Sequence, residues 1–432
     1  MGEPKRNPNK QTAQHKPIDG EAVTQPLWQS DGPIVAMKQG NACGAKESTE
    51  SPTELNRAAN GPRTVEWLKA QLSSLTLRTK RRKGYKFISL AHMLTKDLFR
   101  QCFKELKRNR APGIDRVSVE EYGMKLEERV DKLIVRLKSK RYGPVPVRRT
   151  YIPKSDGGKR PLGIPTVEDK LMQMAVKKIL EPIFEPHFLD FSYGFRPNRD
   201  CHQALDYLDK VIMRKPVNFI IDMDIRKFFD TVDHDWMMLF LKERIVDSNF
   251  LEIIRRMLKA GVMEDGVYHE TNEGTPQGGI LSPLLTNIYL HYVLDIWFDK
   301  VVVKSLKGYA SMVRYADDFI IALENGEDAM KLQEMLKERL AKFGLSISEE
   351  KSRNIPFGRK AWTELRKSGT RPRTFNFLGF THHCSESRKG FFKLETTTRQ
   401  DRFKSAVKKY CEWITKAVLR TTDVIKKVIS VL

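Results

Sequence analysis

The stretch that most constrains the fold of this chain is an acidic pair set between two short apolar runs. Residues 311–315 and 319–323 are rich in residue types that favour strands, and Asp317 and Asp318 lie between them. Two such runs joined by a short polar link are typical of a β-hairpin, which would place both carboxylates at its tip. Because Asp-Asp is also ordinary turn chemistry, the pair alone predicts a turn and nothing more.

A second strand-like run upstream ends in the same way. Residues 219–224 are mainly apolar and include Asp222 and Asp224, which are two positions apart and therefore share one face of a strand. Two carboxylate sources on neighbouring strands suit a pair of Mg²⁺ ions about 4 Å apart, held together with substrate phosphates. The pattern predicts a metal-dependent phosphoryl-transfer site, but its spacing does not choose between Asp222 and Asp224.

The charge balance indicates the kind of partner. The chain has 77 Lys and Arg against 54 Asp and Glu, a formal net charge of +23. Such an excess favours a polyanion, most simply nucleic acid, although a merely soluble or ribosome-like basic protein has the same balance. No apolar run is long enough for a membrane span, and residues 1–10 lack the apolar core of a secretory signal. The five cysteines are scattered without a C-x-x-C pair, which predicts a reducing compartment without disulfides or a zinc site.

Composition and apolar periodicity divide the chain into four parts. Residues 1–62 are rich in polar residues, Gly and Pro, which predicts a disordered tail. Residues 63–215 combine helical patterns with a hairpin. Residues 216–395 contain both acidic strand ends. Residues 396–432 are helical in pattern, with one apolar face expected to pack and one basic face.

Breaking and capping residues predict two helix boundaries. Pro182 is expected to stop a strongly periodic helix that begins near Glu168. Asp423 is expected to cap a second helix after the one over residues 403–418.

Three loops are candidates for contact with a ligand. In the hairpin of residues 148–165, Lys154 and Arg160 flank an Asp-Gly-Gly turn and could reach a triphosphate, although exposed hairpins often carry cations for solubility. The Gly-rich residues 274–285 enter an apolar helix and would let backbone approach an anionic substrate closely. The aromatic turn of residues 191–197 suits either base stacking or a packed corner.

Taken in order, these segments resemble a known family. Three motifs resemble the palm of reverse transcriptases: Asp224-x-x-x-Phe228-Phe229-Asp230, Thr275-Pro276-Gln277-Gly278 and Tyr315-Ala316-Asp317-Asp318. Further segments are similar to group II intron reverse transcriptase/maturases, namely residues 111–115, 152–154, 160–165, 193–197 and 274–289. The resemblance runs from about residue 85 to the C-terminus. It implies an α+β right-hand polymerase, with an N-terminal extension and fingers over 63–215, a palm with an antiparallel sheet and interleaved fingers helices over 216–395, and an incomplete thumb/maturase domain over 396–432.

The resemblance also implies which groups hold metal. Asp224, Asp317 and Asp318 would be the catalytic carboxylates, and with the carbonyl of Ile225 they would coordinate two Mg²⁺ ions. The family motif thus chooses Asp224 over its neighbour two residues earlier. Residues 375–380 resemble the hairpin that grips the primer end.

Other positions match substrate contacts of the family. Phe229 would exclude a 2′-hydroxyl, so that deoxynucleotides are selected, and Gln277 would contact the nascent base pair. Lys154 and Arg160 would hold the triphosphate. Lys351 would donate a proton to the leaving pyrophosphate.

These roles imply an RNA-directed DNA polymerase of a mobile group II intron that also binds its intron RNA and assists splicing. Its partners would be an RNA template, a DNA primer or target and deoxynucleoside triphosphates, within a cytoplasmic ribonucleoprotein of a prokaryote or in an organelle. One alternative is a non-catalytic RNA-binding maturase, against which the intact carboxylates argue. Another is a retron, diversity-generating or CRISPR-associated reverse transcriptase, against which residues 274–289 argue. Because full members carry a longer thumb, the chain is expected to be a fragment or a shortened copy.

Overall fold

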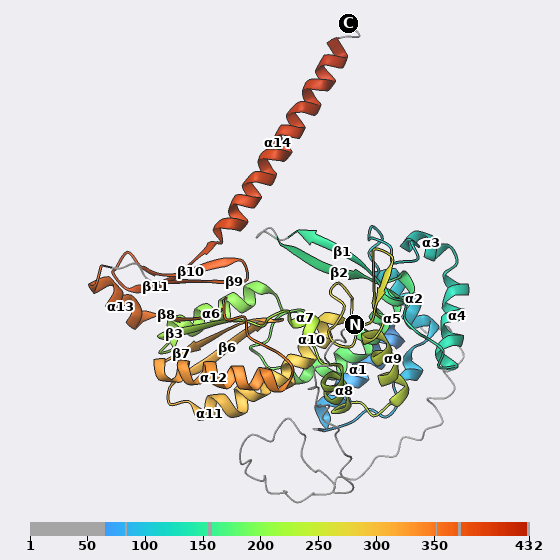
Figure 1. The fold of residues 1–432 in the computed structure, drawn as a ribbon, viewed down its shortest axis with the longest axis horizontal. Coiled ribbons are helices and arrows are strands. Elements are labelled where there is room, and N and C mark those ends of the chain that lie inside the picture. Colours follow the sequence, from blue (N-terminus) through green and yellow to red (C-terminus); the bar gives the residue numbers. More distant parts are fainter. Residues whose placement is uncertain (1–64, 83, 154–157, 351, 370–372, 430–432) are drawn as a thin grey trace, which may run out of the picture. The chain divides into compact units, whose positions relative to one another are not determined.

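The computed structural model describes residues 65–82, 84–153, 158–350, 352–369 and 373–429 (Figure 1). The chain divides into two units, residues 1–48 and 49–432, and the described residues all belong to the second. The tail predicted for residues 1–62 lies outside the described residues, as do Lys154 and Lys351. Among the described helices, none combines the length and the apolar character that crossing a membrane requires.

The central element is a four-stranded antiparallel sheet in the order β6-β7-β3-β8 (Figure 1). Its strands are β6 (Ala310–Tyr315), β7 (Asp318–Leu323), β3 (Phe219–Asp224) and β8 (Arg353–Pro356). The predicted hairpin with an acidic tip is therefore confirmed, as β6 and β7 joined through two residues. Strands β3, β6 and β7 are mainly apolar because helices cover both faces of the sheet: α6 (Cys201–Arg214) packs on β6, and α12 (Gly326–Lys342) packs on β3 and β7.

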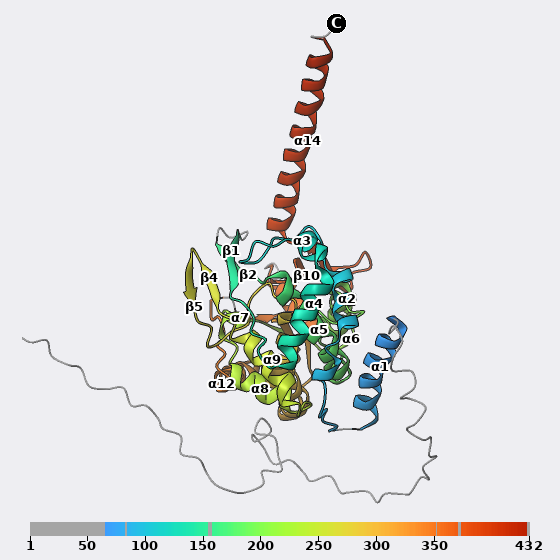
Figure 2. The ribbon, with the colours of Figure 1, turned by 90° about the vertical axis from the view of Figure 1, so that its right-hand side faces the viewer.

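Two smaller sheets complete the strand structure. One has the order β2-β1-β4-β5, with β1 (Val147–Pro153), β2 (Lys159–Ile164), β4 (Val262–Glu264) and β5 (Val267–His269), and Figure 2 shows these strands side by side. The other has the order β11-β10-β9, with β9 (Thr374–Phe377), β10 (Phe380–Glu386) and β11 (Phe392–Thr398). Apolar side chains of this sheet share a buried cluster with α6 and with one face of the central sheet. The mixed helices and antiparallel sheets agree with the α+β right-hand fold.

The remaining helices surround these sheets. They are α1 (Val65–Arg81), α2 (Lys96–Glu105), α3 (Val119–Met124), α4 (Leu126–Lys138), α5 (Val167–Phe184), α7 (Phe228–Thr231), α8 (His234–Lys242), α9 (Ser248–Leu258), α10 (Ser282–Leu290), α11 (Val303–Ser305), α13 (Arg359–Lys367) and α14 (Gln400–Ile429). Short turns η2 (Ala91–Met93) and η3 (Glu185–His187) are 3₁₀, whereas η4 (His291–Asp295) and η5 (Phe298–Val302) are π-helical turns between α10 and α11.

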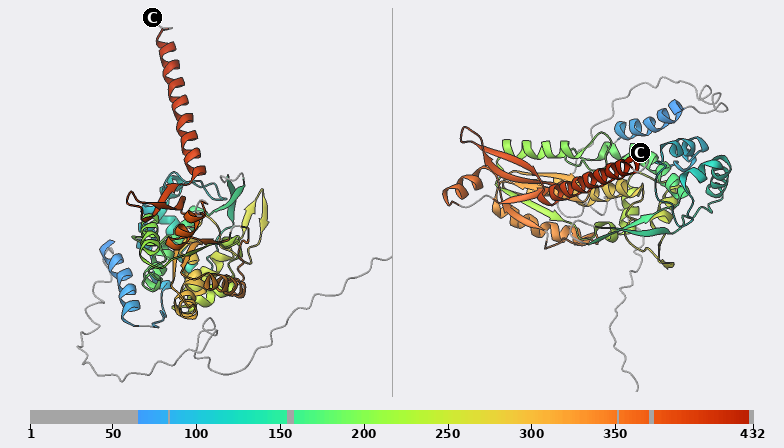
Figure 3. Two further views of the ribbon diagram at one scale, coloured as in Figure 1. Left: turned by 90° about the vertical axis from the view of Figure 1, so that its left-hand side faces the viewer. Right: turned by 90° about the horizontal axis from the view of Figure 1, so that it is seen from above.

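Both predicted helix boundaries are wrong. Helix α5 continues through Pro182 to Phe184. A proline near a helix end removes few hydrogen bonds, and here the extra turn places Ile183 and Phe184 fully out of solvent. Helix α14 is continuous past Asp423, because the segment contains no Gly or Pro to end it (Figure 3).

The apolar face predicted for the C-terminal helix is present as a stripe but does not pack as expected. Its members Phe403, Val407, Tyr410 and Ile414 are between 38% and 62% exposed. The ring of Tyr410 stacks on that of Trp413, 6.0 Å away along the same helix. The surface of α14 in the described residues is therefore both aromatic and basic.

Candidate functional site

The strand register brings the predicted carboxylates to one end of the central sheet. Strands β3 and β7 are antiparallel, and Asp224 lies directly opposite Asp318. Residues opposed in this way have Cβ atoms about 5 Å apart. Asp317 is the turn residue immediately before β7, so it lies at the same end. Asp222 is two residues further into β3, where it opposes Arg353 of β8.

Burial and the close approach of Asp222, Asp224, Asp317 and Asp318, here called the acidic cluster, raise the pKa values of several of these carboxyl groups. The Asp318 side chain reaches solvent, but much of its surroundings is protein. That partial desolvation, with the charges of Asp222, Asp317 and Asp224, raises the pKa of Asp318 to about 7. Burial, with a smaller contribution from Asp224, also raises the pKa of Asp317, while the cation of Arg160 opposes the rise. Burial raises the pKa of Asp222 to about 6 against the attraction of Arg353.

The donor set suits a divalent cation that is completed by substrate. In the described part of the chain, no three or more His, Cys, Asp or Glu side chains stand ready as a metal-binding group. Mg²⁺ does not require such a cage, because it binds through one or two carboxylates and fills its other positions with water and phosphate oxygens. The mutual repulsion around Asp318 is what a divalent cation would relieve. The residues present therefore fit Mg²⁺.

The backbone beside Asp224 is fixed by the segment that follows α12. The carbonyl of Asp224 accepts a hydrogen bond from the amide of Ser348 at 2.8 Å. Ile225, whose carbonyl was a predicted ligand, is 3% exposed and forms an antiparallel bridge with Ile347. This pairing fixes the backbone directly after the last residue of β3.

The Gly-rich loop connects the predicted substrate residues. Gly274 has φ of +84° and donates its amide to the carbonyl of Val232, and the amide of Thr275 donates to the carbonyl of Phe229 at 2.6 Å. The carbonyl of Gln277 accepts a hydrogen bond from the amide of Gly163 at 2.7 Å. The loop thus binds α7, which carries Phe229, on one side and the cationic hairpin β1–β2 on the other.

A buried histidine supports the same loop. His234, the first residue of α8, is 5% exposed, and its Nε2 lies 2.7 Å from the carbonyl of Gly274. Since a carbonyl only accepts, Nε2 carries the hydrogen. Burial lowers the pKa of His234, which keeps the ring neutral in this role. The sequence pattern gave no sign of this support.

The aromatic turn of residues 191–197 is largely packed, although Phe195 is 53% exposed. Arg196 is 8% exposed and donates to the carbonyls of Leu189 and Ser192 and to the carboxylate of Glu185. Its guanidinium is therefore committed to the fold and is not presented to bases.

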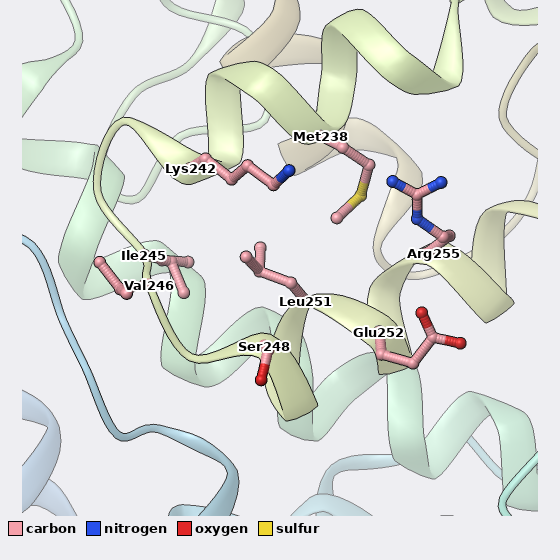
Figure 4. A pocket seen from close by; sticks show the side chains of 8 residues that line it. All are labelled: Met238, Lys242, Ile245, Val246, Ser248, Leu251, Glu252 and Arg255. Atoms are coloured by element: carbon pink, nitrogen blue, oxygen red, sulfur yellow. The ribbon is translucent and has the colours of Figure 1, made fainter. Parts of the chain in front are cut away.

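A separate pocket lies between α8 and α9 and has a volume of about 390 Å³ (Figure 4). Its lining residues are Met238, Lys242, Ile245, Val246, Ser248, Leu251, Glu252 and Arg255. None of them belongs to the acidic cluster or to the Gly-rich loop, so this pocket does not define the candidate site.

A known family matches over the segment that contains this site. The family described as "Reverse transcriptase (RNA-dependent DNA polymerase)" matches residues 152–382, which is more than half of the chain. The matched range runs from the cationic hairpin through both acidic strand ends to β10. The chain belongs to the reverse transcriptase family.

Several curated proteins are similar to the chain. It is 35% identical over 321 residues to "Group II intron-encoded protein LtrA" of Lactococcus lactis subsp. cremoris, covering 60% of this chain and 53% of that protein. It is 34% identical over 241 residues to "Protein YkfC" of Escherichia coli strain K12, covering 49% of this chain and 63% of YkfC. It is also 32% identical over 137 residues to "Nuclear intron maturase 4, mitochondrial" of Arabidopsis thaliana, covering 31% of this chain and 17% of that protein. The chain spans about half the length of LtrA. Two of these three relatives are thus named as a group II intron-encoded protein and an intron maturase.

Proposed function

We propose that this chain is an RNA-directed DNA polymerase of a mobile group II intron, which copies RNA into DNA and binds its intron RNA. The observation that carries the proposal is the register that sets Asp224 opposite Asp318, with Asp317 at the adjoining turn. Three carboxylates at one sheet end suit a polymerase that adds nucleotides to a primer. The similarity to intron-encoded proteins supports the choice of intron RNA as a second partner.

The chemistry divides between the cation and the protein. When bound, Mg²⁺ would lower the pKa of the primer hydroxyl and neutralise charge on the triphosphate. Asp224 and Asp317, with Asp318 beside them and the Ile225 carbonyl, would supply the negative potential that holds the ions. Arg160, whose cation already acts on Asp317, would orient the triphosphate from the hairpin.

The Gly-rich loop and α7 would select the nucleotide. Phe229 is half-buried, and its ring is nearly perpendicular to that of Phe228, with the two ring centroids 5.6 Å apart, so its position is restricted. A restricted ring beside the sugar would exclude a 2′-hydroxyl, and Gln277 would lie along the nascent base pair. Lys154 would assist at the triphosphate and Lys351 would protonate the pyrophosphate. Lys154 and Lys351 lie outside the described residues.

The domain boundaries follow the same proposal. Residues 63–215 would be the N-terminal extension and fingers, 216–395 the palm, and 396–432 the start of the thumb. On α14, the cations Lys404, Lys408, Lys409 and Lys416 are exposed, as a surface along an RNA–DNA duplex requires. The net charge of +23 supports polyanion binding in general.

Primer extension tests the proposal against its non-catalytic alternative. Purified protein would be given a DNA primer annealed to an RNA template, deoxynucleotides and Mg²⁺, beside the variants Asp317→Ala and Asp131→Ala. Asp131 is an exposed carboxylate of α4 that pairs with Lys96, so its loss changes net charge equally without touching the site. We expect extension by wild type and Asp131→Ala only, with salt-sensitive RNA binding by all three. Extension by Asp317→Ala at the wild-type rate would refute the assignment. RNA binding without extension by any of them would favour a non-catalytic maturase.

A further inference from the structure

A fully buried arginine lies three residues before Asp317. Arg314, in β6, is 0% exposed and uses each of its five N–H groups. Nε and Nη2 donate to the two carboxylate oxygens of Asp295 at 2.7 and 2.5 Å. The other bonds from Nη1 and Nη2 run to Asn287 Oδ1 at 3.1 Å, the Ala316 carbonyl at 2.8 Å and Ser192 Oγ at 2.7 Å. A strand residue that forms so many bonds inside the protein has a specific structural task.

One of these bonds fixes the catalytic turn itself. Ala316, between Arg314's strand and Asp317, has φ of +61°, in the left-handed region that L residues rarely adopt. The hydrogen bond from Arg314 to the Ala316 carbonyl stabilises this unfavourable backbone conformation and fixes the peptide between Ala316 and Asp317. Because the next residue is Asp317, the orientation of this peptide sets the direction of the Asp317 carboxylate.

The opposite side of the turn is held by the segment of residues 191–194. The backbone amides of Tyr193 and Arg314 exchange hydrogen bonds with the carbonyls of Arg314 and Phe191, both at 2.8 Å. A Cβ on Gly194 would overlap the backbone nitrogen of Ala316, so only glycine allows this approach. The carbonyl of Gly194 accepts a hydrogen bond from Asn287 Nδ2 at 2.7 Å, which joins this segment to the acceptors of Arg314.

Two of the residues that accept from Arg314 lie in the helical segment formed by α10 and η4. Asn287 belongs to α10, and Asp295 ends the π-helical turn η4, eight residues later. Both are 0% exposed. Single π-helical turns inside helices often occur at functional sites, because they change which side chains face a given direction. Along the chain, η4 is followed by η5 and α11 and then by β6, which carries Arg314.

We propose that Arg314 is a positioning residue for catalysis, which together with Asp295, Asn287 and Ser192 holds the Ala316–Asp317 peptide in its productive orientation. The inference rests on the proposed polymerase function. Buried ion pairs are often replaceable by apolar residues without loss of stability, so stability alone is a weak reason for this pair. A displacement of about 1 Å at a reacting centre, in contrast, can reduce a rate by about 100-fold.

The test separates positioning from folding by replacing the whole ion pair. The double variant R314M/D295L removes both charges and fills the space with apolar atoms, so neither partner is left unpaired. We expect a folded protein with a lower melting temperature, because the buried acceptors of Asn287, Ser192 and Ala316 lose the donor Arg314. Primer–template binding should stay close to wild type. We also expect kcat to fall by about 100-fold, KM for deoxynucleotide to stay within about threefold, and the Mg²⁺ requirement to rise.

A matched control is available in another buried arginine. Arg339 of α12 is 5% exposed and donates to the carbonyls of Val293 and Tyr292 in η4, and its guanidinium lies 4.6 Å from the ring centroid of Phe343. Arg339→Met should lower stability but leave kcat and the Mg²⁺ requirement of the folded protein unchanged. A merely structural role for Arg314 would make both variants behave alike.

The outcomes distinguish this proposal from the proposed function. An inactive wild type would overturn the polymerase assignment itself. An active wild type with an equally active, folded R314M/D295L would overturn the positioning role. If the double variant does not fold, Gly194→Ala decides, because its new methyl group displaces the Ala316 nitrogen directly. A folded Gly194→Ala with full kcat and an unchanged Mg²⁺ requirement would equally overturn it.

Discussion

Acid should destabilise this protein through a histidine in the sheet of β9 to β11. His382 is 1% exposed, its ring stacks on Phe375 at 4.8 Å, and its Nδ1 lies 3.2 Å from the hydroxyl of Thr396. Burial, with a smaller effect of neighbouring His383, lowers the pKa of His382 from 6.5 to about 4. Protonating this ring inside the fold is therefore unfavourable.

The sign and size of the effect follow from proton linkage. Between pH 4 and 6.5 the unfolded chain binds a proton that the folded chain does not, so stability decreases as the pH falls through this range. At 1.36 kcal/mol per pKa unit, the full loss below pH 4 is about 3 kcal/mol, and about 2 kcal/mol is lost between pH 7 and pH 5.

Urea denaturation at pH 7 and pH 5 would measure this contribution. The variant His382→Phe keeps an aromatic ring against Phe375 but cannot be protonated, so its free energy of unfolding should fall by about 2 kcal/mol less than that of wild type. His92→Asn is the control, because His92 is exposed and lies far along the chain from His382. Equal losses for wild type and His382→Phe would show that this histidine is not held neutral by burial, and the reasoning would fail.

Three further predictions concern the site. Gly274→Ala should lower the melting temperature more than Gly266→Ala: both glycines have φ of +84°, but only at Gly274 would a Cβ meet carbonyl oxygens, those of Phe229 and Asp230 at 2.8 and 2.9 Å. Equal decreases in melting temperature would show that only the strain of the positive φ angle matters, and not the contact with the carbonyl oxygens. Phe229→Ala should raise kcat/KM for ribonucleotides relative to deoxynucleotides by about tenfold or more, and an unchanged ratio would contradict its role. Arg160→Ala should raise KM for deoxynucleotides by about tenfold with little change in kcat, which steady-state extension would reveal.

The sequence predicted the parts of this fold that local pattern controls. The hairpin of β6 and β7 followed from two apolar runs around Asp317 and Asp318, because strand propensity and turn chemistry agree over a dozen residues. The hairpin of β1 and β2 followed in the same way. The choice of Asp224 over Asp222 came from the family resemblance alone, because strand periodicity places both on one face. The register shows why the two differ: Asp224 meets Asp318, whereas Asp222 meets Ile320.

The groups that support the site could not be predicted from local pattern. Arg314 lies among strand residues, where a charge normally indicates an exposed position. It is buried because its partners come from segments far away in the chain, with Ser192 122 positions before it. The continuation of α5 past Pro182 has the same origin, since tertiary burial of the last turn outweighed a local breaker.

The anchoring of the cationic hairpin limits how it can move. Its base is tied by the Gly163 bond to the Gln277 carbonyl and by the bond from the Val147 amide to the Gly261 carbonyl at 3.1 Å. Any bending must therefore occur beyond these ties. Arg160 is three residues from Gly163, which is a distance of about 10 Å along a strand. Because this distance is short, the Arg160 guanidinium can move toward or away from the acidic cluster only over a small range.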